Sequence, residues 1–413
     1  VEFISGTLYE NTGSSYAIHV PEGGNGTWSL ANRSTYTNKI TGEGTLTIYC
    51  AVEHGNGWFA TRTPVAVNLS LFTGTINATA DMADSYPRFT LNTSSGMPDG
   101  TLNITAGVTV QNTGRTFRIG KLAGKGTLGG YASFANDGAT GVNTWQVGCD
   151  DDFAWAGTVT ANSKFEKVGS GKMTVSGVWD NTGEVAVKEG TLCLNDRSAE
   201  NAMLGSGELS VEDGAVLCGM GKLGNASVTV ERGGRLYSGT REGASSGTLD
   251  FSGKRLTVST GGEVLFNVAS KVRCTTLEGI SSFSLRGTLK VSVREGLELE
   301  AGDEFQLWVA NRTALSSACT LDLDSPGEGL EWDTSALENG ILKVKTATGI
   351  TGVVSGEPVD CVVYTLDGAR AGSFTCMPSE VGEYMERNGF RSGMYMVKMT
   401  QGQRTESRKV TVD

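Results

Sequence analysis

Three consecutive aspartates, Asp150, Asp151 and Asp152, stand out in the sequence as a group whose side chains could do chemistry. Carboxylates that converge on one point can bind calcium or transfer protons. Neighbouring residues of a strand point to opposite faces, so these three could converge only in a loop. The triplet therefore predicts either a solvated turn between strands, which we favour, or a speculative metal site.

Aromatic and imidazole side chains offer a second set of candidates. Trp58, Trp155 and Trp179 lie beside glycine-rich or acidic segments. A tryptophan on a rigid face could stack on a sugar ring, so we treat these three as speculative ligand-binding residues. The alternative is packing at strand ends. The two histidines, His19 and His54, are expected in loops or on the surface rather than in a catalytic site.

Two G-x-G-x-x-G matches occur, at Gly124–Gly129 and Gly219–Gly224. A dinucleotide fingerprint needs a strand before it and a helix after it, so that the helix start faces the pyrophosphate. Here alternating strand sequence or more glycine follows, and we expect no nucleotide and no cofactor. The chain also lacks the grouped carboxylates and basic residue that polysaccharide lyases and hydrolases require. We therefore predict that it is not an enzyme.

The cysteines are scattered, and none forms a C-x-x-C pair. With only two histidines in the chain, a structural zinc site is not expected. We expect the cysteines to behave as small buried hydrophobic residues, with Cys361 and Cys376 as the best candidate disulfide because both fall in one C-terminal segment. The eight are Cys50, Cys149, Cys193, Cys218, Cys274, Cys319, Cys361 and Cys376.

The composition narrows the range of partners. The 413 residues carry a net charge of -11, with a pI near 4.9, which disfavours nucleic acid and anionic membranes. No apolar window is long enough for a transmembrane helix. The first residues, "VEFISGTLYE", show no signal peptide, so one is absent or already removed. Because the chain begins in strand-like sequence, we expect it to be a fragment of something longer.

The elements that must position these residues are short strands behind glycine corners. Glycine is 58 of 413 residues, and alternating apolar and polar residues follow many of the glycines. Glycine supplies the positive φ of a sharp corner, and the alternation sends apolar side chains to one face. This pattern predicts an all-β parallel β-helix, or β-solenoid, with coils of about 20 residues. The triplet Gly-Thr-Leu begins at Gly6, Gly44, Gly100, Gly126, Gly190, Gly247 and Gly287.

Residues 165–195, "FEKVGSGKMTVSGVWDNTGEVAVKEGTLCLN", resemble the autotransporter-associated β-strand repeat. The shared elements are a lysine before "GSG", an apolar strand, "SG", a loop ending in "TG", a second strand and "GTL". The resemblance extends more loosely over about 340 residues. It implies a β-helical domain over residues 1–345.

Residues 350–413 resemble a different family, the small β-sandwich tail of secreted and surface proteins of Bacteroidetes. The matching segments are "CVVYTLDGARAG", "SGMYMVKM" and "RKVTVD". This resemblance implies a C-terminal β-sandwich for sorting or anchoring, and export to the cell envelope. Only "SEVGEYMERNG", residues 379–389, looks helical.

Together these observations predict a non-catalytic, exported rod at the cell surface, structural or adhesive in role. Surface glycans or components of the host or cell envelope are its expected partners. Two alternatives remain: a glycan-binding module of a surface polysaccharide-utilisation system, and a polysaccharide lyase or hydrolase. Exposed tryptophans along a groove would favour the first alternative. Convergent acids beside a basic residue would favour the second.

Overall fold

The computed structural model describes most of the chain and confirms that it is all-β, with a large parallel sheet. No described helix is long and apolar enough to cross a membrane. The side chains of residues 50, 64, 88–90 and 404 are outside the description. The described residues are 1–10, 12–30, 36–50, 64–80, 88–91, 93, 95–112, 114–129, 142–160, 162–195, 204–347, 356–402 and 404–412.

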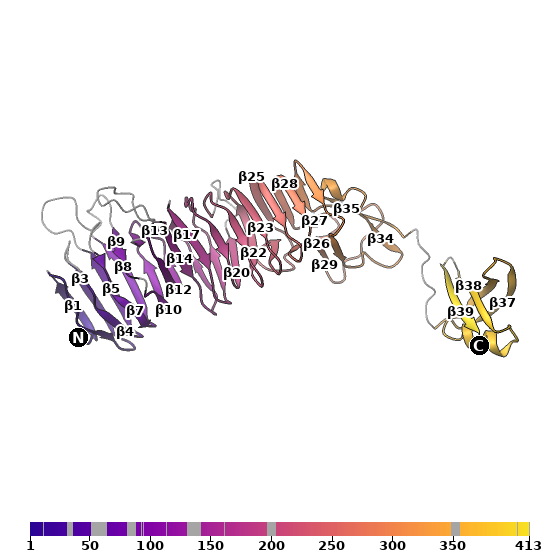
Figure 1. Ribbon diagram of the computed structural model, residues 1–413, viewed down its shortest axis with the longest axis horizontal. Helices are drawn as coiled ribbons and strands as arrows, with labels where there is room; N and C mark the ends of the chain where they lie inside the picture. The colour runs from indigo at the N-terminus through magenta and orange to yellow at the C-terminus, as the bar shows by residue number, and fades with distance from the viewer. Residues whose placement is uncertain are drawn as a thin grey trace. The chain divides into compact units, whose positions relative to one another are not determined.

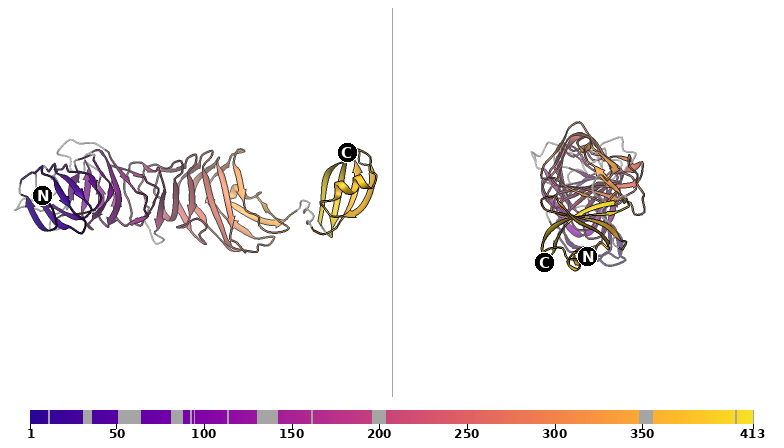
Figure 2. Two further views of the ribbon diagram at one scale, coloured as in Figure 1. Left: turned by 90° about the horizontal axis from the view of Figure 1, so that it is seen from below. Right: turned by 90° about the vertical axis from the view of Figure 1, so that its right-hand side faces the viewer.

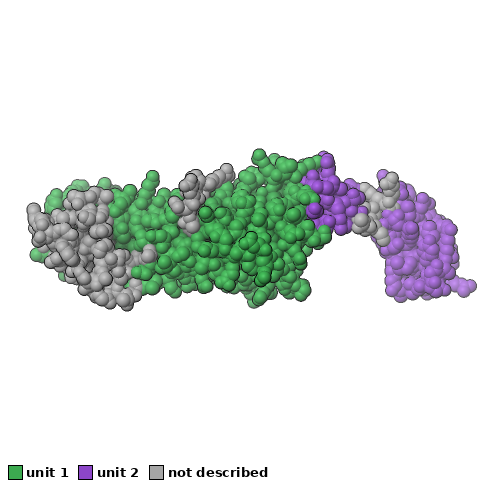
Figure 3. Space-filling model, turned by 90° about the horizontal axis from the view of Figure 1, so that it is seen from above, with its two compact units in different colours: residues 1–297, 304–324, 334–342 green, residues 298–303, 325–333, 343–413 purple. Residues whose placement is uncertain are grey.

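The chain divides into two compact units, coloured separately in Figure 3. Unit 1 comprises residues 1–297, 304–324 and 334–342, and unit 2 comprises residues 298–303, 325–333 and 343–413. The domain boundary expected between residues 345 and 350 stays a prediction, because residues 348–355 lie outside the described part.

Unit 1 is dominated by one network of 24 paired strands. Its strands run side by side in Figure 1 and remain so in the turned view of Figure 2. All its described pairings are parallel except the short antiparallel return of β27 on β26. The strands are β1 (Ser5–Glu10), β3 (Asn25–Leu30), β5 (Thr45–Cys50), β8 (Thr75–Ala80), β10 (Met97–Ile104), β12 (Thr116–Gly124), β14 (Asn143–Val147), β15 (Phe153–Trp155), β17 (Ser163–Lys167), β18 (Lys172–Val175), β19 (Val185–Val187), β20 (Thr191–Asn195), β21 (Leu209–Val211), β22 (Val216–Lys222), β23 (Ser227–Val230), β24 (Arg235–Ser238), β25 (Thr248–Val258), β26 (Glu263–Ser270), β27 (Arg273–Cys274), β28 (Thr276–Leu285), β29 (Thr288–Val293), β31 (Trp308–Ala310), β32 (Thr313–Leu315) and β33 (Thr320–Leu323).

Two smaller parallel sheets flank the first part of this network, and unit 1 also holds the short strand β30 (Glu304–Gln306) and the 3-10 turn η2 (Leu337–Asn339). One sheet contains β2 (Ile18–Val20), β4 (Lys39–Gly42) and β7 (Asn68–Phe72). The other contains β6 (Pro64–Val65), β9 (Arg88–Leu91), β11 (Thr109–Asn112), β13 (Thr127–Gly129) and β16 (Thr158–Val159).

Strands pair with every second strand along the central part of the chain. Strand β17 pairs with β19 and β19 with β21, while β18 pairs with β20 and β20 with β22. Each series of strands paired in this way is a row. A coil is a segment of the chain that contributes one strand to each of the two rows. This alternation needs a sharp corner after each strand, and Gly148 is one of them, with φ of 142°.

The core of unit 1 consists of two in-register rows of apolar side chains, because the strands alternate apolar and polar residues. One row runs through Phe165, Val185, Leu209 and Val228, and the other runs through Met173, Leu192, Leu217, Leu236 and Val264. All of these side chains are at most 1% exposed. Each contributes about 1.5–3 kcal/mol by leaving water.

Unit 2 differs from the predicted β-sandwich. Its described residues 356–412 form a single four-stranded antiparallel sheet in the order β37-β36-β38-β39. The short helix α1 (Val381–Arg387) confirms the one helical segment expected from the sequence. Its Val381 and Met385 join the buried cluster on the sheet, so the helix takes the place of a second sheet. The four strands are β36 (Val359–Thr365), β37 (Arg370–Cys376), β38 (Gly393–Gln401) and β39 (Arg404–Val412), and an antiparallel pair, β34 (Leu330–Asp333) with β35 (Ile341–Thr346), completes the described strands.

Candidate functional site

The three aspartates lie in the corner between β14 and β15, and each binds a different partner. Asp150 accepts hydrogen bonds from the hydroxyl of Ser170 at 2.7 Å and from its backbone N–H at 3.3 Å. Asp152 accepts one from the backbone N–H of Lys172 at 2.8 Å. These two bonds reach the next coil, 20 residues further along the chain.

Asp151 reaches in the other direction, to the Lys121 ammonium at 2.7 Å. That contact raises the pKa of Lys121, and the hydrogen bonds from Ser170 lower the pKa of Asp150. Among the described residues, no three histidine, cysteine, aspartate or glutamate side chains are placed to hold a metal ion. The triplet thus connects three successive coils, as a turn between strands, and we place no metal site there.

Lys167 has a side chain that could do chemistry, but the sequence did not indicate it as a site residue. It ends β17, its side chain is fully buried, and its ammonium donates to three carbonyls. The acceptors are Val168 at 3.0 Å, Gly169 at 2.7 Å and Glu189 at 3.1 Å. Burial lowers the pKa of Lys167 to about 8, against partial compensation from Cys149 and Glu189.

The Lys167 contacts connect two coil corners. The Glu189 carboxylate also accepts a hydrogen bond from the Gly169 N–H at 2.8 Å, so the corners are bonded twice. The only signal for this arrangement in the sequence was the lysine before "GSG" in the repeat pattern, which carries no information on burial. Because all three hydrogen bonds of the ammonium go to backbone carbonyls at coil corners, Lys167 supports a structural role.

The tryptophan prediction needs correction. Trp155 and Trp179 are 1% and 2% exposed, and their rings pack on each other with centroids 5.9 Å apart. Trp179 also packs on Phe165 at 4.6 Å. The burial leaves neither indole a face for a sugar. Trp155 points inward from β15, and Trp179 is buried from the segment between β18 and β19. Trp58 lies outside the described residues.

The two histidines and the two G-x-G-x-x-G matches are the remaining positions that the sequence singled out. His19 is exposed, with Nδ1 3.1 Å from the Thr41 hydroxyl, and His54 lies outside the described part of the chain. The first G-x-G-x-x-G match runs from the end of β12 into β13. The second overlaps β22. A turn and strand β23, rather than a helix, follow the second match, whereas residues 130–141, which follow the first, lie outside the described part.

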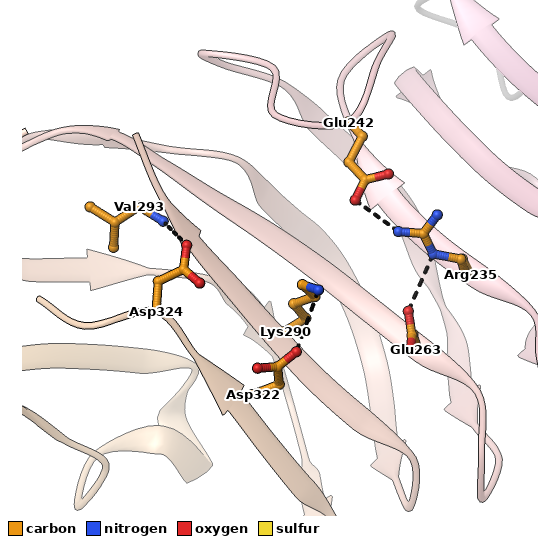
Figure 4. Close-up of polar contacts among 7 residues, drawn as sticks. All are labelled: Arg235, Glu242, Glu263, Lys290, Val293, Asp322 and Asp324. Carbon is orange, nitrogen blue, oxygen red and sulfur yellow. Dashed lines mark hydrogen bonds and ion pairs between the residues drawn. The ribbon is translucent and has the colours of Figure 1, made fainter. Parts of the chain in front are cut away.

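Ion pairs and backbone bonds connect adjacent coils on the outward face of β24, β26, β29 and β33 (Figure 4). Arg235 contacts Glu263 of the neighbouring strand at 3.2 Å and Glu242 of the loop after β24 at 2.8 Å. Against the effect of burial, these two carboxylates raise the pKa of Arg235. Lys290 contacts Asp322 at 3.4 Å. Asp324 accepts a hydrogen bond from the Val293 N–H at 3.0 Å. Each of the carboxylates drawn in the figure has a hydrogen-bond or ion-pair partner, so on this face polar side chains connect one strand to the next.

One open groove lies on the outward side of β15, β18 and β20. It has a volume of about 340 Å³. None of the lining residues is acidic. They are Gly124, Lys125, Ala154, Trp155, Ala156, Thr174, Ser176 and Asn195.

The cysteines divide by burial. Cys193, Cys218, Cys361 and Cys376 are buried, as expected for small hydrophobic residues, whereas Cys149, Cys274 and Cys319 are partly exposed. Burial raises the pKa of Cys361 to about 12, and Cys376 contacts it. In the sheet, however, Cys361 stands opposite Phe374 and Cys376 opposite Val359. Such diagonal neighbours have Cα atoms about 7–8 Å apart, beyond the usual disulfide range, so this disulfide stays a prediction.

Comparison of the chain with protein-family models gives no match, and comparison with curated proteins gives none either. The resemblances to the autotransporter-associated repeat and to the Bacteroidetes tail therefore remain predictions from the sequence.

Proposed function

We propose that the chain is a non-catalytic structural or adhesive protein of the bacterial cell surface, built on a closed parallel β-helix. One observation carries the proposal: the residues best suited to chemistry are used to bond coils together. Hydrogen bonds and an ion pair of Asp150, Asp151 and Asp152 connect three coils, and hydrogen bonds of Lys167 connect two corners. The outward face continues this pattern with charged and amide pairs between adjacent strands.

The in-register pairs support a mechanical role. Asn103 donates to Asn77 at 2.8 Å, Gln146 donates to Glu166 at 2.7 Å, and Lys188 contacts Glu166 at 2.9 Å. Single exposed pairs are worth little, typically below about 1 kcal/mol. Repeated at several places along the stack beside its apolar core, they specify the register and stiffen the stack. A stiff stack is what a spacer or adhesive scaffold requires.

Export and surface location rest on the tail resemblance. The sheet and helix of residues 356–412 would act as the sorting or anchoring element in this proposal. An antibody raised against the purified chain tests it: we expect labelling of intact, unpermeabilised source cells. Labelling only after permeabilisation would overturn the location.

The mechanical role has its own test. Electron microscopy of residues 1–345, stained and imaged as single particles, should show a narrow particle of uniform width. Incubation with a panel of polysaccharides should release neither reducing ends nor unsaturated products. A compact particle, or turnover abolished by substitution of a single acidic residue, would contradict the proposal.

Glycan binding is the second candidate, and the groove beside β15 favours it. Among its lining residues, Ala154 and Thr174 are small enough to leave room for a sugar ring, while Lys125 and Asn195 offer hydrogen-bond donors. A glycan array with the wild-type chain and the Asn195→Ala variant tests this candidate. Binding that is lost in Asn195→Ala but kept in Lys254→Ala, an exposed site on β25, would favour it over a purely mechanical role.

A further inference from the structure

Two thiols stand in register on adjacent strands. Cys193 of β20 pairs with Cys218 of β22. In β20, Cys193 stands between the core residues Leu192 and Leu194, and in β22, Cys218 follows the core residue Leu217. Since residues alternate between faces, both cysteines point to the outward face. Both are nevertheless 0% exposed, so something covers them.

Residues 239–247, which we call the flap, lie over Cys193, and Tyr237 contacts Cys218. Gly239 donates to the Gly219 carbonyl at 2.7 Å, and Lys172 donates to the Thr240 carbonyl at 3.3 Å. The Cys193 thiol lies 3.8 Å from the same Thr240 oxygen. At its far side, the flap is held by Asn267, which donates to the Ala244 carbonyl at 2.9 Å.

The flap is a short segment held by a few hydrogen bonds. Gly239 and Gly243 both have positive φ, of 98° and 69°. A segment of this kind opens at lower cost than the strands beneath it, because it is a loop held by a few hydrogen bonds and the ion pair of Glu242 with Arg235. Opening would expose the Cys193 thiol, which lies against the Thr240 carbonyl, and leave the paired strands in place.

The spacing of the thiols suits a bond between them. Adjacent strands lie about 4.8 Å apart, inside the range of Cα separations found for disulfides. The two thiols already contact each other, and the next residue of the row, Tyr237, contacts Cys218. This is the in-register arrangement that Cys361 and Cys376 lack.

The surroundings distinguish the two sulfurs. The hydrogen bond from Cys218 and the nearby Lys172 charge lower the pKa of Cys193. The pKa of Cys218 is raised, chiefly by its contact with Cys193 and by burial. The lower pKa favours Cys193 as the attacking thiolate and leaves Cys218 as the resolving thiol.

We propose that Cys193 and Cys218 form a redox-active dithiol that closes to a disulfide between two coils when the flap opens to a small oxidised disulfide such as glutathione disulfide. The Cys193 thiolate attacks one sulfur of glutathione disulfide, breaks its S–S bond and releases one glutathione thiolate, which takes up a proton. Cys218 then loses its proton to solvent and attacks the Cys193 sulfur. The mixed disulfide breaks and the second glutathione leaves. Two protein thiols are oxidised, and one glutathione disulfide is reduced to two glutathione molecules.

Peptide mapping of the full chain tests the proposal. Trypsin cuts after Lys188, Arg197 and Lys222, so the two cysteines fall in separate peptides, 189–197 and 198–222. After incubation with glutathione disulfide and alkylation of the remaining thiols, we expect these peptides to be linked, and dithiothreitol to separate them. Absence of the link in protein oxidised in the native state and in protein refolded in glutathione buffer would overturn the proposal.

Single variants test the order of attack. Cys218→Ser should trap glutathione on Cys193, whereas Cys193→Ser should leave Cys218 reduced and free of glutathione. Cys274→Ser, which removes a partly exposed thiol elsewhere in unit 1, should leave the link intact. Trapping on Cys218 instead of Cys193 would contradict the assigned roles, and a dominant link to any other cysteine would contradict the site.

Discussion

At the residue scale, position in the coil decides what a charged side chain does. Asp150 and Asp152 each accept a backbone N–H from the following coil, while Asp151 pairs with a lysine of the preceding one. Lys167 is fully buried, yet its ammonium has three carbonyl partners. A buried charge is tolerated only with such partners, so these contacts explain why a lysine occupies a core row.

Lys167→Met should destabilise unit 1, because three carbonyls at two coil corners lose their donor. We expect the free energy of unfolding to fall by about 2 kcal/mol near pH 7, measured by urea unfolding. Lys164→Met is the matched control on the same strand. Its side chain is 45% exposed and pairs with Glu184 at 3.4 Å, so it should change stability by less than about 0.5 kcal/mol.

The same lysine predicts a pH dependence. The folded pKa of Lys167, about 8, lies below its ordinary value of 10.5, so between these two values the unfolded chain binds more protons. The wild type should therefore gain stability relative to Lys167→Met as the pH rises through this window, by up to about 3 kcal/mol. Unfolding curves of both proteins at a series of pH values measure this. A difference that is constant with pH would contradict the burial of the ammonium.

The aspartate triplet predicts indifference to calcium. If the three carboxylates serve only to bond coils, the Tm should be the same in calcium and in a chelator, as measured by differential scanning calorimetry. Asp152→Asn weakens the acceptor for the Lys172 N–H and should lower the Tm equally in both solutions. A Tm that rises with calcium in the wild type, and not in Asp152→Asn, would restore the metal hypothesis.

At the element scale, glycine corners let one coil sit on the next. At Gly148, φ is 142°, and an added Cβ would lie 1.7 Å from the Val168 carbonyl oxygen. Gly214 also has a positive φ, of 73°, but an added Cβ would meet nothing within 4 Å. Both positions require a positive φ, but the neighbouring coil approaches closely only at Gly148.

Gly148→Ala should therefore cost about 3 kcal/mol, since strain and a backbone clash combine. Gly214→Ala should cost about 1 kcal/mol, from the left-handed conformation alone. Urea unfolding of both variants measures the difference. Equal losses would show that the contact of Gly148 with the next coil has no energetic weight.

At the scale of the whole molecule, the acidic charge sets which partners are excluded. With a net charge of -11, polyanions are repelled unless cations cluster, and lysines such as Lys121, Lys188 and Lys290 are paired with carboxylates. We expect no retention of duplex DNA or of anionic vesicles in gel-shift and sedimentation assays, even at low salt. Binding that weakens steeply with added salt would contradict this expectation.

The amino-acid sequence by itself determined the strands of this protein and their inward faces. The Gly-Thr-Leu triplets and the alternation act locally, so they predicted an all-β chain with a large parallel sheet, and residues 379–389 predicted the site of α1. The single-sheet unit at residues 356–412 was not predicted, because the choice between a second sheet and a helix as cover depends on packing.

Only the tertiary structure decided which residues become neighbours. The bonds of Asp150, the burial of Trp155 and the pairing of Cys193 with Cys218 each depend on the number of residues between one strand and the next strand of its row. That number is set by corners and loops of irregular length, and a change of one residue would turn every side chain of a strand to the opposite face. The local alternation of apolar and polar residues does not specify this number, which only the pairing of the coils determines.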